Sequence, residues 1–231
     1  MQAEIWSDVA CPWCYIGKRR FEEALQSFPH RDEVEVTWRS FQLDPGLPAH
    51  YDGSELDYLS ERKGFPRDRV GEMFAHVAEQ AAGMGLDYDF EHLIVANSFT
   101  AHRLLQFAKV EGAGDAVKEG LLSAHFEHGA DIGDVDVLVS IATSSGLDPE
   151  RVREVLAGDE YADDVRRDIA DATSLGIQGV PFFVIDRTLG VSGAQPAESI
   201  RAVLDQGWTA AHPLQMIGGD DGQACGIDGC D

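Results

Sequence analysis

The sequence predicts an α/β protein in which one small α/β domain is split by an all-helical insertion. Strand patterns occur only near the two ends of the chain, and helical spacing of apolar residues dominates the long stretch between them. The order is strand, helix, strand, a helical block, two strands and a helix. We therefore predict a first part of the α/β domain at 1–51, a helical insertion at 52–173, the second part at 174–212 and a glycine-rich tail at 213–231.

The first strand is expected at Ala3–Ser7, followed by a turn with two cysteines and a helix with one apolar stripe: Phe21, Ala24, Leu25 and Phe28. A second strand follows, because Val34, Val36 and Trp38 alternate with polar residues. The apolar positions then change parity to Phe41 and Leu43, which predicts a β-bulge near Arg39 or Ser40.

In the helical block, apolar stripes at 70–81 and 135–142 each predict one buried helix face. Asp148 before Pro149 predicts a helix N-cap with proline at the first helical position. The elements expected after the block are a strand at Pro181–Ile185, a turn at Asp186–Thr188, a strand at Leu189–Ser192 and a helix from about Pro196.

The composition excludes several classes of protein. The chain has 231 residues, of which 44% are hydrophobic, enough for a sizeable core without disulfide bonds. Its 41 acidic and 18 basic residues give a net charge of -23, which would repel nucleic acids and anionic membrane surfaces. Residues 1–4 lack the basic segment of a signal peptide, and no apolar run is long enough to span a bilayer. We therefore expect a cytoplasmic protein whose few cysteines are chemical rather than structural.

The residues Cys11, Pro12, Trp13 and Cys14 stand at the start of the first predicted helix. There the unpaired backbone N–H groups and the helix dipole favour a thiolate at Cys11. Neighbouring side chains would cover Cys14 one turn further in, so Cys11 is predicted to be the exposed, attacking thiolate and Cys14 the resolving thiol. Pro12 is tolerated in the first turn, and Trp13 adds an apolar surface but no charge. We therefore expect the Cys11 pKa to lie only moderately below the free value of about 8.5.

Zinc is the alternative ligand for these sulfurs, because Cys-x-x-Cys also occurs in zinc sites. A tetrathiolate site would use all four cysteines of the chain: Cys11, Cys14, Cys225 and Cys230. The strand before the motif and the helix after it favour redox chemistry instead. His125 and His128 could form a metal pair, but no third ligand is evident nearby, and a solvated helix face is favoured. We therefore expect neither a metal nor a cofactor.

A second part of the site is predicted at Gly179-Val180-Pro181. Proline is allowed at the first residue of a strand, because no backbone donor is needed there. A cis bond before Pro181 would make a tight turn and free the Val180 backbone to pair with an extended substrate, whereas an ordinary trans proline is the alternative. The predicted substrate contacts are Pro12, Trp13, Val180 and Pro181.

This order of elements and motifs resembles the DsbA-like thioredoxin family, and within it the cytosolic FrnE branch. Relatives of that branch include 2-hydroxychromene-2-carboxylate isomerases and kappa-class glutathione transferases. The resemblance extends to about Trp208 and is carried by four segments: Ser7–Cys14, Trp38–Phe41, Asn97–Arg103 and Gly179–Phe183. It implies a thioredoxin fold interrupted by the helical insertion, and a cis proline at Pro181 that faces the cysteine pair.

The resemblance bears on two further pairs of residues. Asn97 and His102 match a helix near the active turn, although capping or satisfying helix ends is the favoured role for both. Cys225 and Cys230 enclose a glycine-rich stretch that can bend enough to join its ends in a disulfide. Similar tail pairs in FrnE-like proteins imply an accessory redox couple that exchanges with the main pair.

The leading functional hypothesis is a protein-disulfide oxidoreductase that exchanges disulfides with protein or peptide thiols and disulfides, with isomerase activity as an extension. The electron donor would be glutathione or a thioredoxin-type reductant, and the protein a monomer or homodimer. The alternative is a glutathione-dependent transferase or isomerase acting on small hydrophobic molecules, but such relatives typically present serine where Cys11 stands. A third hypothesis is a holdase chaperone whose cysteines only sense oxidation.

Overall fold

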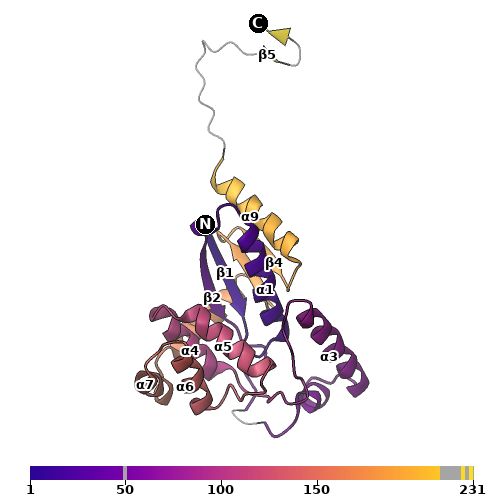
Figure 1. The fold of residues 1–231 in the computed structure, drawn as a ribbon, viewed down its shortest axis with the longest axis vertical. Coiled ribbons are helices and arrows are strands. Elements are labelled where there is room, and N and C mark those ends of the chain that lie inside the picture. The colour runs from indigo at the N-terminus through magenta and orange to yellow at the C-terminus, as the bar shows by residue number, and fades with distance from the viewer. Residues whose placement is uncertain (49–50, 214–224, 227–228, 231) are drawn as a thin grey trace.

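The computed structural model describes residues 1–48, 51–213, 225–226 and 229–230. One sheet has the strand order β2-β1-β3-β4. Its strands are β1 (Gln2–Ser7), β2 (Glu35–Ser40), β3 (Phe182–Ile185) and β4 (Leu189–Ser192). β2 runs parallel to β1, whereas β3 is antiparallel to both β1 and β4. The two central strands thus come from opposite ends of the sequence (Figure 1).

Helix α1 (Pro12–Ser27) follows β1, a short 3-10 helix η1 (Arg31–Glu33) precedes β2, and α9 (Ala197–Ala211) follows β4. The described elements between β2 and β3 are all helical: α2 (Glu55–Asp57), the π-helix η2 (Tyr58–Arg62), α3 (Arg67–Ala82), α4 (Phe99–Val110), α5 (Gly114–Phe126), α6 (Val135–Ser144), α7 (Pro149–Ala157) and α8 (Ala162–Ser174). The predicted α/β fold with an all-helical insertion is therefore confirmed. None of these described helices is long and apolar enough to span a membrane.

Helices cover both faces of the sheet, and their contacts hold the C-terminal end of β1 in place. Ile5 of β1 packs with Phe21 of α1 and Leu204 of α9 in one hydrophobic core. Trp6 belongs to a separate core on the α8 side, and its indole N–H donates to the backbone carbonyl of Asp168 in α8 at 2.9 Å. Since successive side chains of a strand point to opposite faces, these two contacts hold β1 between helices on both sides.

The second strand differs from the prediction in one respect. β2 pairs with β1 residue by residue over its whole length. The strand ends at Ser40, so Phe41 and Leu43 lie beyond it. The predicted bulge near Arg39 or Ser40 is wrong, because the change of apolar parity marks the end of the strand rather than an inserted residue.

Three local predictions in the second half of the chain are confirmed. The Asp148 side chain caps the N-terminus of α7. Asp186 and Arg187 adopt positive φ values and form the turn between β3 and β4. Pro196 is the N-cap residue of α9.

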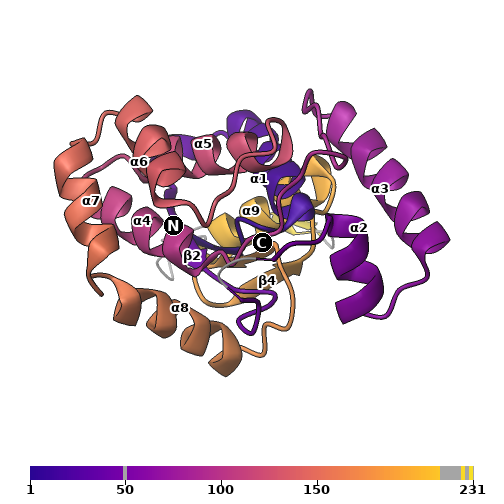
Figure 2. The same ribbon diagram turned by 90° about the horizontal axis from the view of Figure 1, so that it is seen from below.

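The helices of the insertion are arranged around the first turn of α1. In Figure 2, α2 and α3 lie on one side of α1, and α4, α6, α7 and α8 lie on the other. α8 is fixed to the sheet by the Asp168 carboxylate, which accepts from the Ser40 backbone N–H at 2.9 Å and from Arg39 at 3.0 Å. Side chains from both groups of helices can therefore shape the surroundings of the cysteine pair.

The predicted glycine-rich tail lies mostly outside the described residues, at positions 214–224, 227–228 and 231. Within it, β5 (Cys225–Gly226) and β6 (Gly229–Cys230) form a short antiparallel pair. Cys225 lies opposite Cys230 in the backbone register of this pair. The predicted disulfide between them concerns side chains outside the described part of the chain.

Candidate active site

The cysteine pair lies at the start of α1, where the sequence predicts it. Cys11 is the N-cap residue, with an extended backbone, and Pro12 follows in the first helical turn, where an N–H would have no intrahelical partner. The Cys14 N–H donates to the Cys11 carbonyl oxygen at 2.9 Å and closes the turn. Each of the two thiols also acts on the ionisation of the other. The sulfurs are therefore neighbours, as an internal disulfide requires.

The two cysteines differ less in exposure than the sequence predicts. Cys14 is fully buried, as expected, but Cys11 is only 4% exposed. The expectation of an exposed Cys11 is therefore wrong. The reason is that side chains of the helical insertion and the loop at Val180 close over the helix start, and Cys11 meets solvent only through a pocket.

A cis peptide bond joins Val180 and Pro181, as the resemblance implies. The Cys11 thiol donates to the Val180 carbonyl oxygen at 3.5 Å, so this loop faces the cysteine pair. Gly17 of α1 makes room for the loop, because a Cβ added there would lie only 2.7 Å from Pro181 Cγ. A glycine one turn after the cysteines thus lets the proline ring pack directly on the helix.

A pocket of about 420 Å³ opens beside Cys11. It falls within the size range of small-ligand sites, and apolar side chains from η2, α3 and the segment before α4 form most of its wall. Four predicted site residues line it: Cys11, Pro12, Trp13 and Val180. The Trp13 ring packs against His76 of α3, with the ring centres 5.8 Å apart. An apolar substrate group can therefore bind next to the Cys11 sulfur.

The two cysteines ionise unequally, because their surroundings raise the pKa of Cys11 and lower that of Cys14. The hydrogen bond with Cys14, burial and the nearby charge of Asp8 raise the pKa of Cys11 well above its ordinary value. Burial also opposes ionisation of Cys14, but the hydrogen bond with Cys11, the charge of Lys118 and the hydroxyl of Ser7 outweigh burial and lower the Cys14 pKa. The predicted lowering of the Cys11 pKa is therefore wrong, because the contact with Cys14, burial and the charge of Asp8 act against the helix terminus at this sulfur.

Lys118 of α5 is a functional candidate that the sequence did not reveal. Its side chain is 1% exposed, and its Nζ lies 5.6 Å from the centre of the Trp38 ring. Burial lowers the pKa of Lys118, whereas the negative charges of Cys14 and Asp8 act in the opposite direction. Lys118 stands between Val117 and Glu119, and a lysine in a helix gives no sign of burial in the sequence, so only the tertiary structure shows this role.

A buried carboxylate, Asp8, supports the turn before the cysteines. It accepts hydrogen bonds from the backbone N–H groups of Ala10 at 3.2 Å and Leu43 at 2.8 Å, and its Oδ1 lies 3.2 Å from His102 Nε2. Burial alone would raise the Asp8 pKa, but these contacts, His102 first, lower it. His102 is therefore a buried partner of Asp8 and does not cap a helix end, contrary to the favoured expectation.

The other residues singled out in the sequence, Asn97, His125 and His128, lie in three different environments. Asn97 accepts from the Phe99 backbone N–H at 2.9 Å at the start of α4 and donates to the Leu47 carbonyl oxygen at 2.7 Å, which confirms its helix-end role. His125 lines the pocket and is buried, and burial lowers its pKa to about 4. Of these two histidines only His128 is exposed to solvent as expected, because His125 lies on the buried side of α5.

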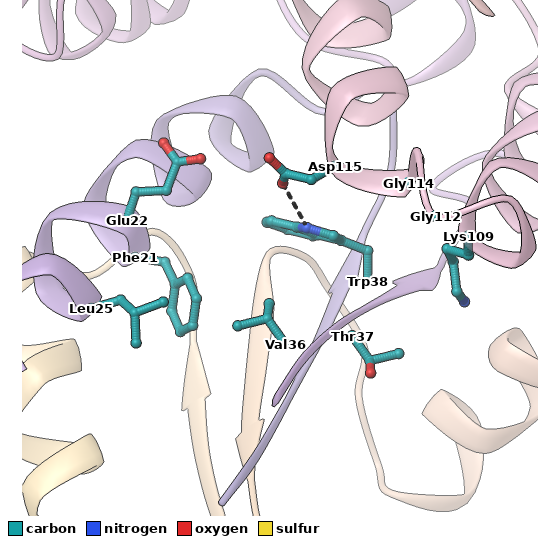
Figure 3. Close-up of a pocket in the computed structure, with 10 residues that line it drawn as sticks. All are labelled: Phe21, Glu22, Leu25, Val36, Thr37, Trp38, Lys109, Gly112, Gly114 and Asp115. Atoms are coloured by element: carbon teal, nitrogen blue, oxygen red, sulfur yellow. Dashed lines mark hydrogen bonds between the residues drawn. The ribbon is translucent and has the colours of Figure 1, made fainter. Parts of the chain in front are cut away.

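A second cavity, of about 520 Å³, lies beside the edge strand β2. Figure 3 shows Trp38 extending across it, between Phe21 of α1 and Lys109, with the indole N–H donating to Asp115 at 3.3 Å. No cysteine and no predicted substrate contact lines this cavity. The smaller pocket next to Cys11 is therefore the candidate active site.

The fold and the site together define the class of protein. A β-α-β unit continued by an antiparallel strand pair and a helix, with Cys-x-x-Cys at the first helix start and a cis proline opposite, is a thioredoxin fold with its dithiol site. The chain belongs to the family of the DSBA-like thioredoxin domain, whose model matches residues 2–205.

Known proteins resemble the chain over nearly its whole length. A probable DsbA oxidoreductase from Streptomyces coelicolor has 45% identity and a TM-score of 0.88, with coverage of 100% of this chain and 98% of that one. The uncharacterized protein YwbO of Bacillus subtilis (strain 168) is 27% identical over 211 residues, 88% of this chain and 96% of that protein. Cytosolic disulfide reductase DsbM from Pseudomonas aeruginosa, solved with GSH, is 19% identical with a TM-score of 0.63, covering 89% of this chain and 98% of its own. This last likeness shows the shared fold.

Proposed function

We propose that this protein is a thiol-disulfide oxidoreductase that exchanges disulfides with protein or peptide substrates through Cys11 and Cys14. The observation that carries the proposal is the position of Cys11, whose sulfur lines an apolar pocket, lies beside the Cys14 thiol and faces the Val180 carbonyl oxygen. The pocket offers a place for a side chain next to a substrate cysteine. The Val180 backbone offers a partner for the extended chain of the substrate.

In the reducing direction, the Cys11 sulfur attacks the substrate disulfide while its proton passes to the neighbouring Cys14 thiolate. A mixed disulfide forms at Cys11, and the first substrate sulfur leaves as a thiolate. Cys14 then gives up this proton and attacks the Cys11 sulfur, which expels the second substrate sulfur. Cys11 and Cys14 end as a disulfide. Their two electrons have passed to the substrate sulfurs, and their one proton has passed to a substrate sulfur or to solvent. Oxidation of a substrate dithiol follows the same steps in reverse.

Lys118 is a positioning residue in this proposal. Its buried ammonium group favours the Cys14 thiolate, and that thiolate is needed twice: as the acceptor of the Cys11 proton and as the resolving nucleophile. Because Cys14 is fully buried, solvent cannot stabilise its charge, and a protein charge must do so.

We place this chemistry in the cytoplasm, with glutathione or a thioredoxin-type protein as the electron donor. The solved DsbM with GSH, a relative in fold, supports a glutathione-linked cycle. Cys225 and Cys230 are proposed as an accessory couple that exchanges with Cys11 and Cys14. Their backbone register, residue opposite residue, is compatible with a disulfide between them.

The second candidate is a glutathione-dependent transferase or isomerase for small hydrophobic molecules. The apolar pocket favours it, since 420 Å³ is enough space for such a molecule. Cysteine at position 11 counts against it, because the relatives with that activity typically present serine there. The sulfur pair favours exchange chemistry.

Two assays separate these functions: reduction of insulin by dithiothreitol, and conjugation of chlorodinitrobenzene to glutathione. We expect the wild-type protein to accelerate insulin reduction, the Cys11→Ser variant to be inactive, and neither to catalyse conjugation. Conjugation that survives replacement of Cys14, without insulin reduction, would reject the proposal. Aggregation suppression as the sole activity of both proteins would indicate the holdase function instead.

A further inference from the structure

Among the residues that the structure describes, Glu55 has no counter-charge in the wall of the active-site pocket. The other charged residues that line this pocket are satisfied: Asp8 accepts three hydrogen bonds, and Asp44 pairs with Lys63 at 3.0 Å. Within the described residues, the Glu55 side chain has neither an ion pair nor a hydrogen bond, and burial is what acts on its ionisation. The pocket therefore contains one carboxylate that a ligand can pair with.

The position of Glu55 is fixed by its neighbours. It is the first residue of α2, directly after Ser54, which forms a capping box with Asp57. The adjoining pocket wall is apolar, with Leu59 and Val95 among its members. In these surroundings the pKa of Glu55 rises to about 7, so a large share of the protein carries this charge at neutral pH. An uncompensated carboxylate in a poorly solvated wall disfavours the empty state, and a bound cation relieves it.

We propose that the pocket selects disulfide substrates that carry a basic side chain beside an apolar one close to the reacting cysteine, with Glu55 recognising the cation. The inference rests on the proposed disulfide exchange at Cys11, which lines the same pocket. The apolar wall between the two residues would hold the uncharged part of the substrate. The net charge of -23 adds long-range attraction for cationic peptides and repels anionic disulfides.

Three fluorescent peptide disulfides test the inference. The peptides share an apolar residue after the cysteine and differ only at the next position, which is Lys, Gln or Glu. We expect the wild-type protein to reduce the Lys peptide with a kcat/KM about fivefold above that of the Gln peptide, as one partly desolvated ion pair would give. The Glu peptide should be the poorest substrate.

Glu55→Gln removes the charge at nearly constant shape and should make the Lys and Gln peptides equivalent. Glu61→Gln is the matched control: this exposed residue of η2 does not line the pocket, and its replacement removes the same formal charge. It should keep the preference for Lys. Equal rates for all three peptides with the wild-type protein, or a Lys preference that survives in Glu55→Gln, would overturn the inference while leaving disulfide exchange intact. Failure to exchange with every peptide would reject the proposed function itself.

Discussion

Replacement of Gly17 by alanine tests the packing of Pro181 onto α1. In an open helix, alanine in place of glycine adds about 1 kcal/mol to the free energy of unfolding. At Gly17 the new Cβ would lie 2.7 Å from Pro181 Cγ and 3.2 Å from its Cβ, so helix and loop must separate. Overpacking of this kind costs about 1–3 kcal/mol, which leaves a net loss of up to about 2 kcal/mol. Disulfide exchange should slow as well, because the Val180 carbonyl oxygen would move away from Cys11.

Gly71→Ala in α3 is the matched control. Gly71 is exposed, and a Cβ added there would have no atom within 4 Å, so this variant should gain about 1 kcal/mol. The difference between the two variants isolates the contact with Pro181. Urea unfolding of both reduced proteins, followed by tryptophan fluorescence, measures it. Equal stabilisation of the two variants would refute the packing argument.

Three other predictions concern charge and the tail. Lys118→Met should raise the pH at which the first thiolate forms, seen by ultraviolet absorbance, and slow insulin reduction at least about tenfold; an unchanged titration would show that Lys118 does not act on Cys14. The pKa of Asp8 is lower in the folded protein than in the unfolded chain. The ionised carboxylate therefore stabilises the fold fully above the unfolded-state pKa of about 3.9, and this stabilisation is lost as the pH falls through the folded-state pKa. The stability difference between wild type and Asp8→Asn, about 3–5 kcal/mol at pH 7, should therefore shrink below about pH 4, and a constant difference would contradict the assignment. Replacing Cys225 and Cys230 with serine should slow turnover; an unchanged rate with every substrate would show that the tail pair is inert.

The sequence predicts the sheet and the cysteine pair because their signals are local. β1 contains three apolar residues, Ala3, Ile5 and Trp6, directly before the cysteine turn, and β3 begins directly after a proline. The cysteines and Pro12 fit the chemistry of a helix start without knowledge of the rest of the fold. The domain boundaries at 51, 173 and 212 stay predictions, since they depend on where one packing unit ends and another begins.

The electrostatics of the site could not be predicted in the same way. Lys118 and His102 lie about a hundred residues from the cysteines in the sequence, and burial alone distinguishes them from ordinary helix residues. The helix terminus alone favours charge on Cys11, whereas the folded chain brings up a lysine that favours charge on Cys14. Glu55 likewise resembles any acidic residue at a helix start until the fold places it in the pocket wall.

The mass of the covalent adduct between the Cys14→Ser variant and a peptide disulfide tests the central claim most directly. Without the resolving thiol, the mixed disulfide should accumulate, and peptide mapping should locate one substrate peptide on Cys11. No adduct at Cys11, or an adduct confined to Cys225 and Cys230, would show that the sulfur at the start of α1 is not the attacking group.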